Sequence, residues 1–258
     1  MKTEEKTLLE GLTLSKKECI SITGGGGKTG LGNYLARKLN NLGKVVIFTT
    51  TTKIYPPQTG EKEILIFTTE HLWLNRIDTS LRENKLIYLA SEVLPQGKIK
   101  GLTTRICKDI LIKTNCDYLI IEADGSKGRS IKAHSDTEPV VPDFTTLFIP
   151  VIGIDCLMAR LDDNNCHRCG LLCKMLQVHK GELIDTNLIY SLFKHPEGYL
   201  KTVPEKSRVI VFINKVHKEE QRQEAIKLGE KLLSLKQIDG ILIGHVKPPG
   251  ETFILLRR

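Results

Sequence analysis

The stretch that most constrains the fold is Ser21–Gly30, which reads SITGGGGKTG. Four consecutive glycines follow a short apolar run and lead into a helical pattern that starts at Lys28. Glycines let the backbone turn tightly and bring several N–H groups to one anion, and a helix N-terminus adds further donors. The stretch therefore predicts a phosphate-binding loop. We expect a nucleotide to be held by Gly24, Gly25, Gly26, Gly27, Lys28, Thr29 and Gly30.

In such a loop Lys28 would carry the catalytic positive charge at the terminal phosphates, and Thr29 would place its hydroxyl on a phosphate-bound Mg²⁺. The loop is shorter than the usual phosphate-loop pattern, which requires a further glycine at the position of Ile22. The shortened form G-x-x-G-K-T is similar to the nucleotide loop of the Mur-type amide ligases. A glycine-rich turn without a ligand is the alternative, and the flanking strand and helix favour the phosphate loop.

Apolar runs alternate with helical periodicity along most of the chain, which predicts an α/β fold. Residues 1–17 read as a short helix or arm. Strands are expected at Glu18–Thr23, Lys44–Thr49, Glu63–Thr68, Lys85–Ala90, Tyr118–Ile121, Thr145–Ile154, Arg208–Ile213, Gly240–Gly244 and Phe253–Leu256. Helices are expected at Lys28–Leu42, His71–Leu81, Leu102–Lys113, 169–178, 183–194 and Lys218–Leu235. We predict a P-loop NTPase-like, mostly parallel sheet flanked by helices.

We expect residues 1–258 to form a single domain, because 258 residues suit one large α/β domain. Residues 155–207 are more irregular and read as an α-helical insertion or cap over the carboxyl edge of the sheet. No apolar run is long enough to span a membrane, and the charged N-terminus lacks a signal-type stretch, so we expect a cytoplasmic protein. The net charge is +8, but basic residues are scattered among acids and aromatics are 5%, which argues against nucleic acid as a partner.

A second informative stretch is Asp117–Asp124, DYLIIEAD. A buried strand would deliver Glu122 and Asp124 to its carboxyl end, on the same side of the strand. Phosphate-loop enzymes bring a carboxylate to Mg²⁺ in this way, so we expect Asp124 to hold the metal and Glu122 to act as a catalytic base. The run of threonines at 49–52 ends another strand, and we expect Thr51 to contribute to the metal site. The alternatives are a solvated acidic turn and ordinary strand preference of threonine.

Two further segments carry candidate ligand contacts. The polar segment Ser126–Pro142 follows the acidic strand and would present Lys127 and His134 to a substrate. The strand at 208–213 runs into Asn214-Lys215-Val216-His217, where many GTPases have the guanine-reading pattern N-K-x-D. Because His217 replaces the aspartate, bidentate guanine recognition is lost. Asn214 and Lys215 would still line a base pocket, and the choice between ATP and GTP stays open.

Four of the seven cysteines lie close together, at Cys156, Cys166, Cys169 and Cys173. Thiolates at this spacing can hold zinc or an iron–sulfur cluster. We favour the simpler interpretation that Cys169 and Cys173, one helical turn apart, face the core.

Taken together, these residues resemble the YqeC family of selenium-dependent hydroxylase accessory proteins, also called selenium cofactor biosynthesis proteins. The resemblance runs from about Ile20 to Gly244. Its motifs are the GGGGKT loop, TTTTKI at Thr49–Ile54, EADGSKG at Glu122–Gly128, EPVVP at Glu138–Pro142, the pair His167–Arg168, GYLKTVP at Gly198–Pro204 and the strand ending in NKV. Gly30, His217 and the cysteines around His167 depart from the family pattern.

The resemblance implies a phosphate-loop nucleotide-binding protein linked to the maturation of selenium-dependent molybdenum hydroxylases. It also implies a role for His167 and Arg168, which we expect to contact a phosphate or an anionic substrate. Our first hypothesis is a Mg²⁺-dependent enzyme that hydrolyses or transfers a phosphoryl or nucleotidyl group. The alternatives are a nucleotide-gated protein that delivers the cofactor to the hydroxylase, and a Mur-like ATP-dependent ligase.

Overall fold

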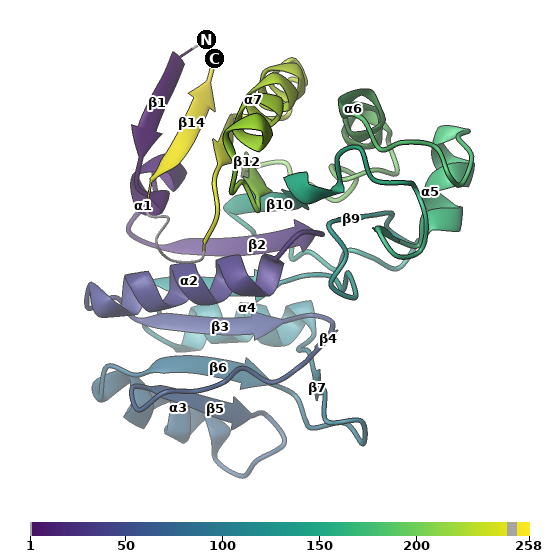
Figure 1. Ribbon diagram of the computed structural model, residues 1–258. Helices are drawn as coiled ribbons and strands as arrows, with labels where there is room; N and C mark the ends of the chain where they lie inside the picture. The colour runs from purple at the N-terminus through teal and green to yellow at the C-terminus, as the bar shows by residue number, and fades with distance from the viewer. Residues whose placement is uncertain (1, 247–251) are drawn as a thin grey trace.

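The computed structural model describes residues 2–246 and 252–258, and a ten-stranded sheet forms its centre (Figure 1). Neighbouring strands from β13 to β5 run parallel, whereas β14 is antiparallel to both β13 and β1. In spatial order the strands are β1 Lys2–Lys6, β14 Phe253–Arg257, β13 Gly240–Ile243, β12 Arg208–Asn214, β10 Leu147–Gly153, β2 Glu18–Gly24, β8 Tyr118–Glu122, β3 Val46–Thr50, β6 Leu86–Ala90 and β5 Glu63–Phe67. The predicted α/β class with a mostly parallel sheet is confirmed.

Helices cover both faces of this sheet. Helix α2 (Lys28–Asn41) and the short α1 (Leu8–Leu12) pack on one face, where Leu31 and Leu35 meet Ile22 of β2. The opposite face is covered by α3 (Trp73–Arg82), α4 (Thr104–Lys113) and α7 (Glu219–Leu233). Helices α2, α3, α4 and α7 begin within a few residues of their predicted positions, because their apolar faces recur at helical spacing.

The connections of the two central strands leave the sheet in opposite directions. Strand β2 leads through α2 to β3, passing β8, whereas β8 leads to β10, passing β2. In open α/β sheets, ligands bind in the crevice at the carboxyl ends of strands where such a reversal occurs. The reversal lies between the strand that carries the glycine loop and the strand that ends in Glu122.

Strands β10 and β12 are parallel neighbours, and a long connection joins them. It carries the 3-10 helix η1 (Ile154–Cys156), strand β11 (Cys166–His167), α5 (Cys169–Leu176) and α6 (Thr186–Lys194). Strand β11 pairs with β9 (Ile131–Lys132), and Figure 1 shows α5 and α6 at the side toward which β2 points. Our interpretation of 155–207 as an insertion or cap stays a prediction.

The N-terminal segment differs from the expected helix or arm. Residues 2–6 form β1 against β14, and Thr7 then caps α1, since its hydroxyl accepts from the Glu10 N–H and the Glu10 carboxylate accepts from the Thr7 N–H. A small antiparallel pair, β4 (Lys53–Ile54) and β7 (Ile99–Lys100), lies beside the ends of β3 and β6. Among the described residues, no helix is both long and apolar enough to cross a membrane.

Candidate functional site

The glycine loop turns sharply between the end of β2 and the start of α2. Gly24, Gly26 and Gly27 have φ angles of +94°, +75° and +109°, a region that favours glycine. At Gly26 there is also no space for a side chain, because a Cβ atom would lie 2.1 Å from the backbone nitrogen of Gly153. The glycines therefore allow the loop to pack against the end of β10.

The loop's backbone donors divide into two groups. The Gly24 N–H donates to Asp124, the Gly25 N–H to the Val151 carbonyl at 2.9 Å and the Gly26 N–H to the Arg129 carbonyl at 2.8 Å. These three glycines were predicted to bind phosphate, and in the structure the N–H group of each has an acceptor within the protein. The N–H groups of residues 27–30, at the cap and in the first turn of α2, have no acceptor among the described residues. These are the donors that the loop can offer to an anion.

The side chain of Lys28 is 1% exposed and points back into the loop. Its Nζ donates to the Gly24 carbonyl at 2.5 Å and lies 3.2 Å from Asp124 Oδ1 and 4.0 Å from Glu122 Oε1. The structure thus brings together the three side chains predicted to be catalytic.

Asp124 is fully buried, and its carboxylate already contacts several cationic and hydrogen-bonding groups. Besides Lys28 and the Gly24 N–H, it contacts Lys132 Nζ at 3.0 Å and His134 Nε2 at 2.6 Å. Burial raises the pKa of Asp124, but Lys28, the His134 hydrogen bond and Lys132 together hold it well below its usual range. His134, predicted to contact a substrate, is itself 4% exposed and belongs to this internal network.

Glu122 has a different environment from Asp124. Its Oε2 accepts from the Thr29 hydroxyl at 2.8 Å, and both residues line the same open cavity. Burial raises the pKa of Glu122, while Lys28 and the Thr29 hydrogen bond oppose the rise. A carboxylate and a hydroxyl oxygen thus lie side by side, next to the free N–H groups of the α2 N-terminus.

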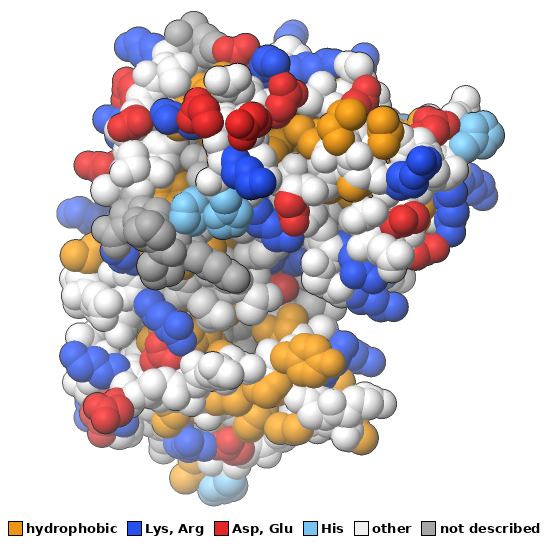
Figure 2. Space-filling view, in the orientation of Figure 1, with side chains coloured by type: hydrophobic (Ala, Val, Ile, Leu, Met, Phe, Trp, Pro, Cys, Tyr) orange, Lys and Arg blue, Asp and Glu red, His pale blue; other side chains and the backbone are white. Residues whose placement is uncertain are grey.

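The cavity over this pair has a volume of about 840 Å³. Its basic lining residues are Lys28, Lys53, Lys98, Lys127, Arg168 and Lys215, against the acidic Glu122 and Glu138. Figure 2 shows the molecule hollowed at the right, with Lys and Arg side chains above and below the hollow. His167 also lines the cavity, and burial together with Lys132 and Arg168 lowers its pKa to about 4, so it is neutral at pH 7. An excess of positive charge suits a polyphosphate.

Two residues that we did not predict as site residues complete the network. Lys132 is fully buried, and its Nζ contacts Glu138 Oε2 at 2.9 Å as well as Asp124. The same Glu138 oxygen accepts from Arg168 Nη1 at 2.6 Å. A chain of ion pairs therefore runs from the glycine loop to Arg168, the residue that precedes α5. The sequence signal that could have identified these two residues was a lysine and a glutamate in the charged segment after β8.

The side chains of the threonine run at 49–52 mainly form hydrogen bonds with backbone carbonyls. The hydroxyls of Thr49, Thr50 and Thr51 donate to the carbonyls of Leu89, Glu122 and Val140 at 2.7, 2.7 and 2.8 Å. The Thr51 hydroxyl, which was predicted as a metal ligand, thus donates its hydrogen bond to the Val140 carbonyl in this structure.

The end of β12 lies beside the loop and a second cavity of about 560 Å³. Asn214 Nδ2 donates to the Gly26 carbonyl at 2.7 Å, so it fixes the loop, while Lys215 contacts Ser130 and Asp155. Asn214, Lys215 and Gly30 all line this cavity, together with His217 and its ring neighbour His245. The predicted base-pocket residues therefore border an open space next to the helix N-terminus.

The four clustered cysteines pack into or beside the hydrophobic core formed with Leu161 and Leu172. The closest pair, Cys169 and Cys173, has its sulfurs 3.9 Å apart. Within residues 2–246 and 252–258, no group of three or more His, Cys, Asp or Glu side chains is arranged to hold a metal ion.

Two comparisons with known proteins identify relatives of the chain. A family model described as YqeC protein matches residues 20–170. The chain is also similar to a protein of Escherichia coli (strain K12) described as Uncharacterized protein YqeC. The two are 30% identical over 230 residues, which cover 88% of this chain and 87% of the relative.

Proposed function

The chain belongs to the YqeC family, and from this membership and the site geometry we propose that it is a P-loop NTPase-like enzyme. It would bind a nucleoside triphosphate with Mg²⁺ and hydrolyse or transfer a phosphoryl or nucleotidyl group. The observation that carries the proposal is the Thr29–Glu122 pair, whose oxygens are 2.8 Å apart at the N-terminus of α2. That pair faces a basic cavity at the point where the strand connections reverse.

The residues present suit Mg²⁺, a hard cation that prefers oxygen ligands and shares them with phosphates and water. Thr29 and Glu122 would hold it. Asp124, our expected ligand, fits less well, because its oxygens already accept from Gly24, His134 and two lysines. When bound, the ion would supply charge neutralisation at the phosphate oxygens.

The other groups have separable roles in this proposal. The N–H groups of residues 28–30 bind phosphate oxygens, and Lys28 places its positive charge beside the transferred group. Asp124 is a positioning residue, because it fixes both the Lys28 ammonium and the Gly24 N–H. Asn214 and Lys215 border the space next to the loop where a base would lie.

We place this activity in the maturation of selenium-dependent molybdenum hydroxylases, which is the pathway that the family resemblance implies. The hydroxylase or an intermediate of its cofactor would then be the partner. Co-purification of the tagged protein with the hydroxylase from a selenium-grown culture tests this placement, and its absence from hydroxylase fractions speaks against it.

A nucleotide-gated delivery protein is a second candidate, and one observation favours it. The contacts Asp124–Lys132–Glu138–Arg168 connect the loop to the segment that carries α5. A nucleotide that draws Lys28 away from Asp124 would change the charge balance along this chain. Such a protein would hydrolyse nucleotide without forming another small-molecule product.

The test is to incubate the protein with Mg-ATP or Mg-GTP and measure release of phosphate and pyrophosphate. Thr29→Val removes the hydroxyl and keeps the shape, whereas Thr29→Ser keeps the hydroxyl. We expect Thr29→Val to lose Mg²⁺-dependent turnover and Thr29→Ser to retain it. Equal turnover of the two variants would contradict the assignment of the metal site.

A further inference from the structure

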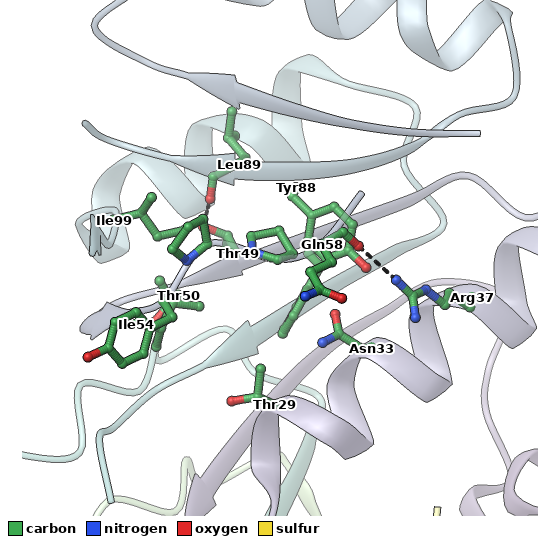
Figure 3. A pocket seen from close by; sticks show the side chains of 14 residues that line it. Thr29, Asn33, Arg37, Thr49, Thr50, Ile54, Gln58, Tyr88, Leu89 and Ile99 are labelled. Carbon is green, nitrogen blue, oxygen red and sulfur yellow. Dashed lines mark hydrogen bonds between the residues drawn. The ribbon is translucent and has the colours of Figure 1, made fainter. Parts of the chain in front are cut away.

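A third cavity, of about 310 Å³, lies between α2, the ends of β3 and β6, and the loop after β4 (Figure 3). Its residues come from three sources: Thr29, Asn33 and Arg37 from α2, Phe48, Thr49, Thr50, Tyr88 and Leu89 from the sheet, and Ile54, Tyr55, Pro56, Pro57, Gln58 and Ile99 from the flanking segments. Ligand pockets usually have volumes of about 300–1,000 Å³, so this cavity suits a small ring rather than a whole nucleotide.

The walls of this ring cavity combine apolar and aromatic side chains with a few polar ones, and they carry no uncompensated charge. Phe48, Leu89 and Ile99 are buried around it, while Tyr55 is 69% exposed at its edge. The one charged lining residue is Arg37, and its guanidinium is paired with Glu63 at 2.7 and 3.1 Å. The cavity therefore suits an uncharged, planar group, in contrast to the basic cavity over Glu122.

Two buried polar groups at the ring cavity are incompletely hydrogen-bonded. The Tyr88 side chain is 2% exposed and its hydroxyl lies beside the Arg37 guanidinium, which can only donate, so the hydroxyl proton has no acceptor among the described residues. Asn33 Oδ1 likewise has no hydrogen-bond donor among them. Buried polar atoms are almost always hydrogen-bonded, so a ligand that fills this cavity and pairs with both atoms would satisfy them. A tyrosine hydroxyl can donate to a carbonyl, and the asparagine oxygen accepts from an N–H. A cyclic amide presents both groups on one edge.

We propose that this cavity binds an uncharged, fused, planar N-heterocycle with a cyclic amide edge, held by Tyr88 and Asn33 and covered by Tyr55. Thr29, Ile54 and Tyr55 line both this cavity and the basic cavity, so a substituent on the ring would reach the Thr29–Glu122 pair. The ring site would thus hold a second substrate beside the nucleotide. The placement of a second substrate beside the nucleotide rests on the proposed function, whereas binding of the heterocycle in this cavity does not.

The probes are hypoxanthine and lumazine, two fused heterocycles with cyclic amide edges, and binding is measured by ligand-detected NMR without nucleotide. Tyr88→Phe removes the hydroxyl and keeps the ring. Tyr55→Ala removes the exposed aromatic cover. Leu42→Ala is the matched control, because Leu42 is 64% exposed at the other end of α2.

We expect Tyr88→Phe to weaken binding about five- to tenfold, the value of one hydrogen bond, and Tyr55→Ala about tenfold. Leu42→Ala should bind as the parent does. Unchanged binding in Tyr88→Phe, or no binding of either probe at millimolar concentration, would overturn the proposal. Displacement of the probe by Mg-ATP or Mg-GTP would also overturn it, since the cavity would then belong to the nucleotide.

These outcomes are separable from failure of the proposed function. If no nucleotide stabilises the parent protein but hypoxanthine binds through Tyr88, the ring site stands and the nucleotide site does not. If nucleotides stabilise the parent and Tyr88→Phe equally while neither probe binds, the reverse holds.

Discussion

Replacement of the buried Lys132 by methionine should strongly destabilise the protein. The Lys132 ammonium is fully buried, lies 3.0 Å from Asp124 and 2.9 Å from Glu138, and donates to the Gly125 carbonyl at 2.6 Å. Methionine has a similar volume and fills the same space, so the variant removes the charge rather than creating a cavity. It leaves Asp124 buried with one cation fewer.

The magnitude follows from the burial of the partners. Removing one member of a buried ion pair costs about 3–5 kcal/mol, and we expect about 3 kcal/mol, because Lys28 and His134 still contact Asp124. For a chain of this size, each kcal/mol lowers Tm by about 2–4 °C. Lys132→Met should therefore lower Tm by about 6–12 °C.

The assay is thermal unfolding followed by circular dichroism at pH 7, with Lys180→Met as the control. Lys180 pairs with Asp163 at 2.7 Å, but the two side chains are 54% and 71% exposed, so the change should leave Tm almost unchanged. Adding Asp124→Asn to Lys132→Met should cost less than the sum of the single changes. Equal Tm values for Lys132→Met and Lys180→Met would refute the reasoning.

Two further predictions concern the loop and the basic cavity. Gly26→Ala should destabilise the protein by several kcal/mol and abolish nucleotide binding, because its φ is +75° and its Cβ would strike the Gly153 backbone. Gly30→Ala, with its nearest atom 3.6 Å away, should change stability by about 1 kcal/mol or less; equal effects in denaturant unfolding would contradict this account. His167 has its pKa lowered from 6.5 to about 4, so only the unfolded chain takes up this proton between those pH values. Stability should fall as pH falls through that window, His167→Asn should reduce the slope, and an unchanged slope would count against a half-buried, neutral His167.

The sequence was sufficient for the strands of the sheet except the edge strand β1, and for the position of the glycine loop at its centre. Apolar strands such as Tyr118–Ile121 and the helix starting at Lys28 have local patterns, so their positions follow from spacing. The alternation of a strand also placed Glu122 and Asp124 near Lys28.

Local sequence patterns do not show how deeply a side chain is buried or which residues, distant in the sequence, it contacts. Which of Glu122 and Asp124 faces the open cavity depends on Lys132 and His134, whose approach to Asp124 is a product of tertiary packing. The engagement of the Gly25 N–H likewise depends on Val151, far away in the sequence. The ring cavity has no sequence motif, because it forms where the loop after β4 folds back over Tyr88.

The proposed Mg²⁺–nucleotide site consists of the α2 N-terminus and the Thr29–Glu122 pair. Isothermal titration of the protein with ATP and with GTP, each with and without Mg²⁺, tests it most directly. We predict binding of at least one nucleotide that is tighter with Mg²⁺, and loss of that Mg²⁺ dependence in Thr29→Val. Absence of binding by both nucleotides in the presence of Mg²⁺ would contradict this assignment.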